Sequence, residues 1–192
     1  MKPFDPPPGP DDDPSVAGPA SSGCPHLSLR PETPDDAPFL AALFASVRGP
    51  EFEGNGWPEE VRDAFLAQQF RFQSAHYAHH YADADFSIVE RHGAPVGRFY
   101  LHRGLTDHRI VDISLLPEAR NQGLGGALLD IACAEADRLG RVASLHVDKS
   151  NPAQRLYARK GFIRVGESGP RWHMIRAPGP EAPAGAHAET GA

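Results

Sequence analysis

Apolar residues recur with two different periods along residues 26–176, and the two periods separate helices from strands. Helical spacing predicts helices over residues 34–49, 58–79, 124–139 and 152–160. Alternating or continuous apolar runs predict strands over residues 26–30, 85–90, 96–101, 110–116, 142–147, 162–166 and 172–176. The expected order is therefore one strand, two helices, three strands, a helix, a strand, a short helix and two final strands.

The two ends of the chain lack this periodicity. Residues 1–25 hold eight of the twenty prolines together with the acidic run 11–13, and almost no large apolar side chains. Residues 177–192 return to proline, glycine and alanine. Such segments cannot bury enough apolar surface to fold, so we expect disordered tails on either side of one domain, residues 26–176.

One junction between a strand and a helix, residues 115–126, carries the strongest chemical signal. Arg120, Gly123 and Gly125 lie between the apolar run that ends at Leu116 and the helical run that begins at Leu124. Unpaired backbone N–H groups at a helix start attract an anion, and glycine allows that backbone to come close to a ligand. A forked arginine suits phosphate oxygens. The stretch predicts a diphosphate cradle, although a glycine-rich turn without a ligand has the same spacing.

Two linked motifs make the sequence resemble the GNAT superfamily of N-acyltransferases. Leu115-Leu116-Pro117 followed by Arg120-x-x-Gly123-x-Gly125 resembles the first motif of that family. Residues 145–153, with Tyr157 and Gly161-Phe162 after them, resemble its second motif at the usual distance. The resemblance implies an α/β fold (an α+β mixed sheet), in which helices flank a central mixed sheet that has antiparallel strands first and a parallel central pair.

The resemblance also implies a cosubstrate, acetyl-CoA, and the residues that bind it. Its diphosphate would lie on backbone amides after a strand that splays from its parallel neighbour, and an N–H near Leu115 would hold the thioester carbonyl. Asn151 would contact CoA, cap the short helix, or do both. The predicted cofactor-binding residues are Leu115, Leu116, Arg120, Asn121, Gln122, Gly123, Leu124, Gly125, Gly126 and Asn151.

Three side chains are candidates for the chemistry. Tyr157 stands where the family carries a tyrosine general acid that protonates the departing thiolate; otherwise its ring packs on the sheet. His146 is a candidate base, or else a strand histidine with a structural partner. Asp112 could receive the substrate ammonium, or could form a structural pair with Arg109 or Arg98.

Three histidines form a second candidate site, one for a metal ion. His76, His79 and His80 share one helix face, but no glutamate follows the first histidine as in the HExxH motif, and the family needs no metal, so we expect no metal site. The surrounding segment, residues 51–81, is rich in glutamine and tyrosine and would border the acceptor pocket.

Charge and cysteine content limit the classes of binding partner and the cellular compartment that we expect. Of the net charge of −6, residues 1–25 contribute −3 and residues 177–192 contribute −2, so the remaining −1 gives no footprint for nucleic acid or an anionic membrane. The two cysteines, Cys24 and Cys133, give no disulfide framework, and no apolar run is long enough to span a membrane, which together favour a cytoplasmic protein.

The sequence therefore predicts an acetyl-CoA-dependent N-acetyltransferase that moves acetyl directly to a primary amine in a ternary complex. The alternative is a catalytically silent module that binds acyl-CoA as a sensor or scaffold; an intact Tyr157 favours the enzyme. By analogy with the family, C-terminal edge strands could pair two subunits into a homodimer.

Overall fold

The computed structural model describes residues 27–179 as one mixed sheet with helices on both faces. The strands are β1 (Leu27–Pro31), β2 (Asp85–Arg91), β3 (Ala94–Arg103), β4 (Asp107–Leu115), β5 (Val142–Asp148), β6 (Ile163–Ser168) and β7 (Arg171–Arg176). The helices are α1 (Ala37–Arg48), α2 (Glu59–His80), α3 (Leu124–Arg138) and α4 (Gln154–Arg159), with single turns η1 (Pro34–Asp36), η2 (Gly49–Phe52) and η3 (Pro117–Ala119). Type and order of the elements confirm the predicted fold class.

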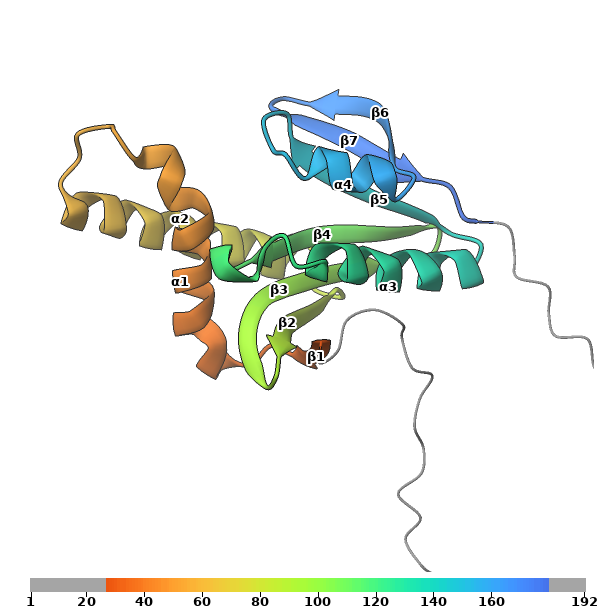
Figure 1. Cartoon of the computed structure of the whole chain (residues 1–192), viewed down its shortest axis with the longest axis horizontal. Coiled ribbons are helices and arrows are strands. Elements are labelled where there is room, and N and C mark those ends of the chain that lie inside the picture. Colours follow the sequence, from red (N-terminus) through yellow and green to blue (C-terminus); the bar gives the residue numbers. More distant parts are fainter. Residues whose placement is uncertain (1–26, 180–192) are drawn as a thin grey trace, which may run out of the picture.

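The seven strands lie in the order β1-β2-β3-β4-β5-β7-β6 (Figure 1). All neighbouring pairs are antiparallel except the central pair, β4 and β5. The final hairpin places β7 beside β5 and leaves β6 at the edge, an exchange that the apolar pattern alone does not indicate. The loop between β2 and β3 is shorter than predicted, because His92 and Gly93 both take positive φ angles, of 53° and 75°, in a tight turn.

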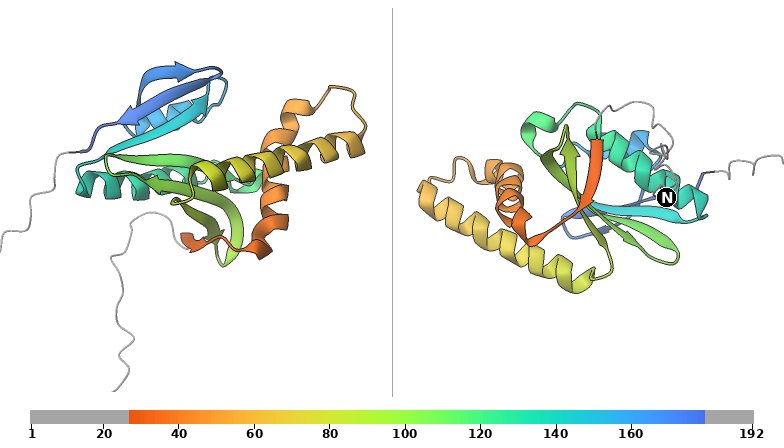
Figure 2. Two further views of the ribbon diagram at one scale, coloured as in Figure 1. Left: turned by 180° about the vertical axis from the view of Figure 1, so that it is seen from behind. Right: turned by 90° about the horizontal axis from the view of Figure 1, so that it is seen from below.

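The helices divide between the two faces of the sheet. Figure 2 shows α2 in front of the strands in the view from behind, whereas α3 lies in front of them in Figure 1. Residues spaced four apart on α3, including Leu128, Ala132 and Ala136, are fully buried against β4 and β5. Burial of a large apolar side chain such as Leu128 contributes about 1.5–3 kcal/mol, and the small alanines let α3 approach the sheet closely. A smaller core joins α1 to Ile88 on the opposite face.

The two central strands separate partway along their length. β4 pairs with β5 only from Asp107 to Ile110, where Ile110 faces Leu145. A β-bulge follows directly, because the register with β3 passes from Ile110 to Asp112 and leaves Val111 unmatched. Bulges bend a strand and increase its twist. Beyond the bulge β4 stays with β3 and diverges from β5, as Figure 1 shows.

The described chain reaches three residues past the predicted domain end at Arg176. The backbone N–H of Gly179 donates to the Asp137 carboxylate at 2.6 Å, and Arg176 donates to both oxygens of the same group. The disorder predicted for residues 1–25 and for most of residues 177–192 concerns positions outside the described range. Across residues 27–179, no helix has both the length and the apolar character needed to cross a bilayer.

Candidate active site

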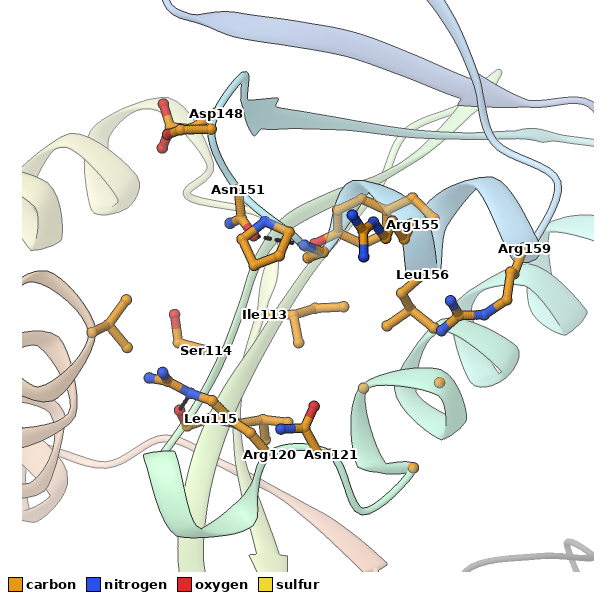
Figure 3. A pocket seen from close by; sticks show the side chains of 18 of the residues that line it. Ile113, Ser114, Leu115, Arg120, Asn121, Asp148, Asn151, Arg155, Leu156 and Arg159 are labelled. Carbon is orange, nitrogen blue, oxygen red and sulfur yellow. Dashed lines mark hydrogen bonds between the residues drawn. The ribbon is translucent and has the colours of Figure 1, made fainter.

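A cavity of about 870 Å³ occupies the gap between the diverging strands. Residues Ile113–Leu115 of β4 form one wall, and the segment from Asp148 to Arg159 forms the other. Figure 3 shows Arg120 and Asn121 on one side of this cavity, with Asn151, Arg155 and Arg159 across from them. The two motifs that lie thirty residues apart in the sequence therefore meet around one space.

The loop before α3 has a backbone that leaves several N–H groups directed outward. Asn121 and Gly123 adopt left-handed conformations, with φ of 59° and 81°, and Gly123 precedes the first helical residue. The first intrahelical bond is donated by Ala127 to Gly123, so the three N–H groups before it have no helical acceptor. A Cβ on Gly125 would lie 3.3 Å from Leu156 Cδ2, a close contact that requires a small shift of the Leu156 side chain, and a longer side chain at this position would occupy more of the cavity.

The divergence of the strands directs the backbone of Leu115 into the cavity. Leu116 N–H donates to Val96 of β3 at 2.9 Å. Because hydrogen-bonding direction alternates along a strand, the N–H and C=O of Leu115 point the other way, toward the gap. The Arg120 Nε atom donates to the Leu115 carbonyl at 3.0 Å, which fixes the arginine at the rim (Figure 3).

Most of the predicted cofactor-binding residues line this cavity, but three do not. Leu116 packs against the smaller core, and its N–H is bonded to β3. The Gln122 side chain accepts from Arg91 and donates to the Glu118 carbonyl. Leu124 is buried in the core, although its backbone begins α3. Asn151 lines the cavity and caps the turn before α4, since its Oδ1 accepts from Ala153 N–H at 2.8 Å.

Two arginines that the sequence reasoning did not single out complete the lining. Arg155 and Arg159 both face the cavity from α4. Their spacing of four places them on one face of the helix, so this signal was present in the sequence. Arg48 of α1 also lines the cavity, where it pairs with Glu51 at 3.0 Å. Among the residues that line the cavity, the arginines therefore outnumber the two acidic residues, Glu51 and Asp148.

Tyr157 lies on α4, where its ring meets Phe162 edge-on at a centroid distance of 6.2 Å. It lines the cavity, and its ring packs against the main core. Burial, with a smaller effect of the Asp112 carboxylate, raises the pKa of the Tyr157 phenol to about 12. The phenol therefore stays protonated at neutral pH and is a hydrogen-bond donor there.

Asp112 forms the structural ion pair that was one of its two expected roles, and its partner is Arg98 rather than Arg109. Arg98 Nη2 lies 2.6 Å from Asp112 Oδ2, and the side chains are only 3% and 11% exposed. The Tyr77 hydroxyl donates to the same oxygen at 3.0 Å, and the Ser114 hydroxyl donates to Oδ1 at 2.6 Å. The carboxylate charge is thus fully engaged within the protein.

His146 contacts a cation rather than a carboxylate. Its Nδ1 lies 3.0 Å from Arg109 Nη1, and its ring stacks on His173 at a centroid distance of 4.8 Å. Arginine has no acceptor, so Nδ1 must accept and the proton of the neutral ring must reside on Nε2. Burial, then the charge of Arg109, lowers the pKa of His146. The ring is therefore neutral near pH 7 in this arrangement.

The three histidines of α2 are engaged with one another. The rings of His76 and His80 lie 4.1 Å apart, and His80 Nδ1 contacts the His76 carbonyl at 3.0 Å. Among residues 27–179, no group of three or more His, Cys, Asp or Glu side chains is arranged to hold a metal ion.

A family model for the acetyltransferase (GNAT) domain matches residues 82–164, which include both motifs. A search of curated proteins finds no match.

Solved structures share the fold at low sequence identity. A PaiA N-acetyltransferase from Thermoplasma acidophilum, solved with coenzyme A, is 16% identical with a TM-score of 0.60, covering 79% of this chain and 98% of that one. A GCN5-related N-acetyltransferase from Rhodopseudomonas palustris is 22% identical with a TM-score of 0.57, covering 82% and 99%. A GNAT acetyltransferase from Elizabethkingia anophelis, solved with acetyl-CoA, is 16% identical with a TM-score of 0.50, covering 79% and 98%.

Proposed function

We propose that this chain, which has the GNAT fold and matches the GNAT acetyltransferase domain, is an N-acetyltransferase that uses acetyl-CoA and a primary amine. Both substrates would be bound together, and acetyl would pass directly between them. The observation that carries this proposal is the cavity between β4 and β5, whose lining includes both the glycine loop and Tyr157. The coenzyme A and acetyl-CoA named with the similar structures support the choice of acyl donor.

The lining of the cavity fits the chemistry of coenzyme A. The outward N–H groups at the start of α3 and the forked side chain of Arg120 suit a diphosphate. Arg155 and Arg159 add positive charge that suits the third phosphate group of coenzyme A, which lies outside the diphosphate. The gap beyond them is bounded by Ile113 and by the outward backbone of Leu115, which suits an extended amide-bearing arm.

Acetyl transfer requires the acceptor nitrogen to bond to the thioester carbonyl carbon while the carbon–sulfur bond breaks, so the nitrogen loses a proton and the sulfur gains one. We assign a backbone N–H of β4 near Leu115 to the carbonyl oxygen, where negative charge develops. The role of Tyr157 is to donate its phenolic proton to the sulfur, which leaves as the thiol of coenzyme A. The proton released by the amine passes to solvent water, and water returns a proton to the Tyr157 phenolate. The contacts of Asp112 with Arg98 and of His146 with Arg109 favour positioning roles for these two residues over removal of the amine proton.

The test combines binding with turnover on the full chain. Calorimetry should detect acetyl-CoA binding, and release of free CoA thiol should occur with at least one class among amines, amino acids and short peptides. Gly125→Glu should abolish binding, because bulk and negative charge would enter the cradle, whereas Gly125→Ala should keep most of it. Tight binding without turnover would favour the sensor alternative, and absence of binding would contradict the proposal.

A further inference from the structure

A second, smaller cavity of about 160 Å³ lies beside the point where β4 and β5 separate. Its lining includes Ile110 and Val111 of β4 and His146 of β5. Ile110 is the last residue of β4 that pairs with β5, and Val111 is the bulged residue that follows. The cavity therefore opens at the base of the gap in which acetyl-CoA is proposed to bind.

A polar bridge links this cavity to the larger one. Tyr77 lines the small cavity and donates to the Asp112 carboxylate at 3.0 Å. The charge of the same carboxylate acts on the pKa of Tyr157, which lines the large cavity. Asp112 also lies on β4 between Val111, which lines the small cavity, and Ile113, which lines the large one, so the two cavities adjoin along this strand.

The side chains around the small cavity present donors and positive charge. Arg109 of β4 and Arg171 of β7 both line it, and no acidic residue does so within the described part of the chain. Each arginine has one carboxylate neighbour at longer range: Arg109 Nε lies 3.7 Å from Asp107, and Arg171 Nε lies 3.4 Å from Asp148. Guanidinium groups carry five N–H donors, so both retain donors beyond these contacts.

Internal hydrogen bonds also decide that two neutral side chains in the lining present hydrogen-bond donors to the cavity. Arg98 donates to Gln73 Oε1 at 2.5 Å, which leaves the Gln73 amide N–H₂ as the group available to the cavity. Arg109 contacts His146 Nδ1, which leaves an N–H on Nε2. Two arginines, an amide N–H₂ and an imidazole N–H form a set that recognises an anion rather than an ammonium group.

We propose that this cavity binds the carboxylate of the acceptor, and that the acceptor is a free α-amino acid. The inference rests on the proposed acetyltransferase function. A volume of about 160 Å³ corresponds to about five water-sized groups, which accommodates the three carboxylate atoms and the α-carbon of an amino acid while its amine lies at the edge toward the larger cavity. The N-terminus of a peptide has no carboxylate at that distance and would leave the arginines without a partner.

The experiment compares each acceptor with itself across variants of the full chain, so that differences in amine basicity cancel. Acceptors are free amino acids, their carboxamides and dipeptides that begin with the same residue. Arg171→Gln and Arg109→Gln should each raise KM for the free amino acid about tenfold or more, the usual effect of losing a hydrogen bond to a charged group. With Arg171→Gln, rates with the carboxamide should change less than about twofold, because the variant removes only a hydrogen bond that a carboxylate accepts.

Two further measurements distinguish failure of this inference from failure of the proposed acetyltransferase function. The Arg171 side chain is 56% exposed, so Arg171→Gln tests carboxylate binding without disturbing the fold. Arg62→Gln on α2 is a matched control that should change no rate. Calorimetry with acetyl-CoA, together with turnover of carboxamides, reports on the acetyltransferase itself. The inference is overturned if no free amino acid is acetylated, or if both arginine variants leave KM unchanged while acetyl-CoA still binds. Loss of acetyl-CoA binding in the unaltered chain would overturn the proposed function as well.

Discussion

At the scale of single residues, the proposed chemistry depends most on the Tyr157 hydroxyl. Its ring contacts Phe162 and the main core, so removal of the oxygen alone preserves the packing. Tyr157→Phe should therefore keep the affinity for acetyl-CoA and lower kcat by about 10²-fold, as is usual for loss of a general acid. Calorimetry measures the affinity for acetyl-CoA, and thiol-release kinetics measure kcat.

The pH dependence of the unaltered chain gives a second check on Tyr157. Because burial raises the pKa of this phenol to about 12, its proton is present across the neutral and mildly alkaline range. Deprotonation of Tyr157 should therefore cause no fall in kcat between pH 7 and about pH 10. Unchanged kcat in Tyr157→Phe would remove the residue from the mechanism.

At the scale of elements, the start of α1 is stabilised by a compact charged group. Asp36 accepts from the backbone N–H of Thr33 at 2.8 Å and from both terminal nitrogens of Arg30, at 2.6 and 2.7 Å. The Arg30 guanidinium, followed by the Thr33 contacts, holds the pKa of the Asp36 carboxyl well below its usual value. The turn η1 and helix α1 are thereby joined to β1.

This group predicts a pH-dependent stability. A carboxyl whose pKa is lowered in the folded state stabilises it fully above the unfolded pKa, about 3.9, and this contribution is lost as pH falls toward the folded pKa. Asp36→Asn should lower the free energy of unfolding by about 1 kcal/mol at pH 7, with a difference that shrinks below about pH 4.

Urea unfolding at pH 7 and pH 3 measures the effect of Asp36→Asn. The neighbouring Asp35 is exposed and provides a matched control of the same residue type. Asp35→Asn should leave the free energy of unfolding nearly unchanged at both values of pH. An equal loss of stability at pH 7 and pH 3 in Asp36→Asn would exclude the charged contact as its cause.

At the scale of the whole molecule, both cores and both cavities are built from residues 27–179. A chain of residues 26–179 should therefore fold and turn over like the full chain. A chain that ends at Arg176 lacks the Gly179 contact to Asp137 and should have a lower Tm. Thermal unfolding and thiol release compare the two with the full chain, and loss of activity in residues 26–179 would show that a tail takes part in function.

The local sequence pattern was sufficient to predict the helices and strands and the position of the glycine loop. Helix and strand periods depend on neighbours a few positions away, so the order of elements was predictable, as was the position of Gly123 before α3. The partner of Asp112 was not predictable, because Arg98 and Arg109 are equally available in the sequence and only the register of β3 on β4 selects Arg98.

The sequence by itself determined which segments form strands and helices, and it placed the two motifs that resemble those of the GNAT family at the ends of those segments. The tertiary structure decided how distant segments meet: the insertion of β7 beside β5, and the bulge at Val111 that separates β4 from β5. It also brought Arg109 and Arg171 to one cavity. The physical reason is that side-chain periodicity acts over a few residues, whereas strand order, twist and bulges depend on backbone pairing between segments far apart in the chain.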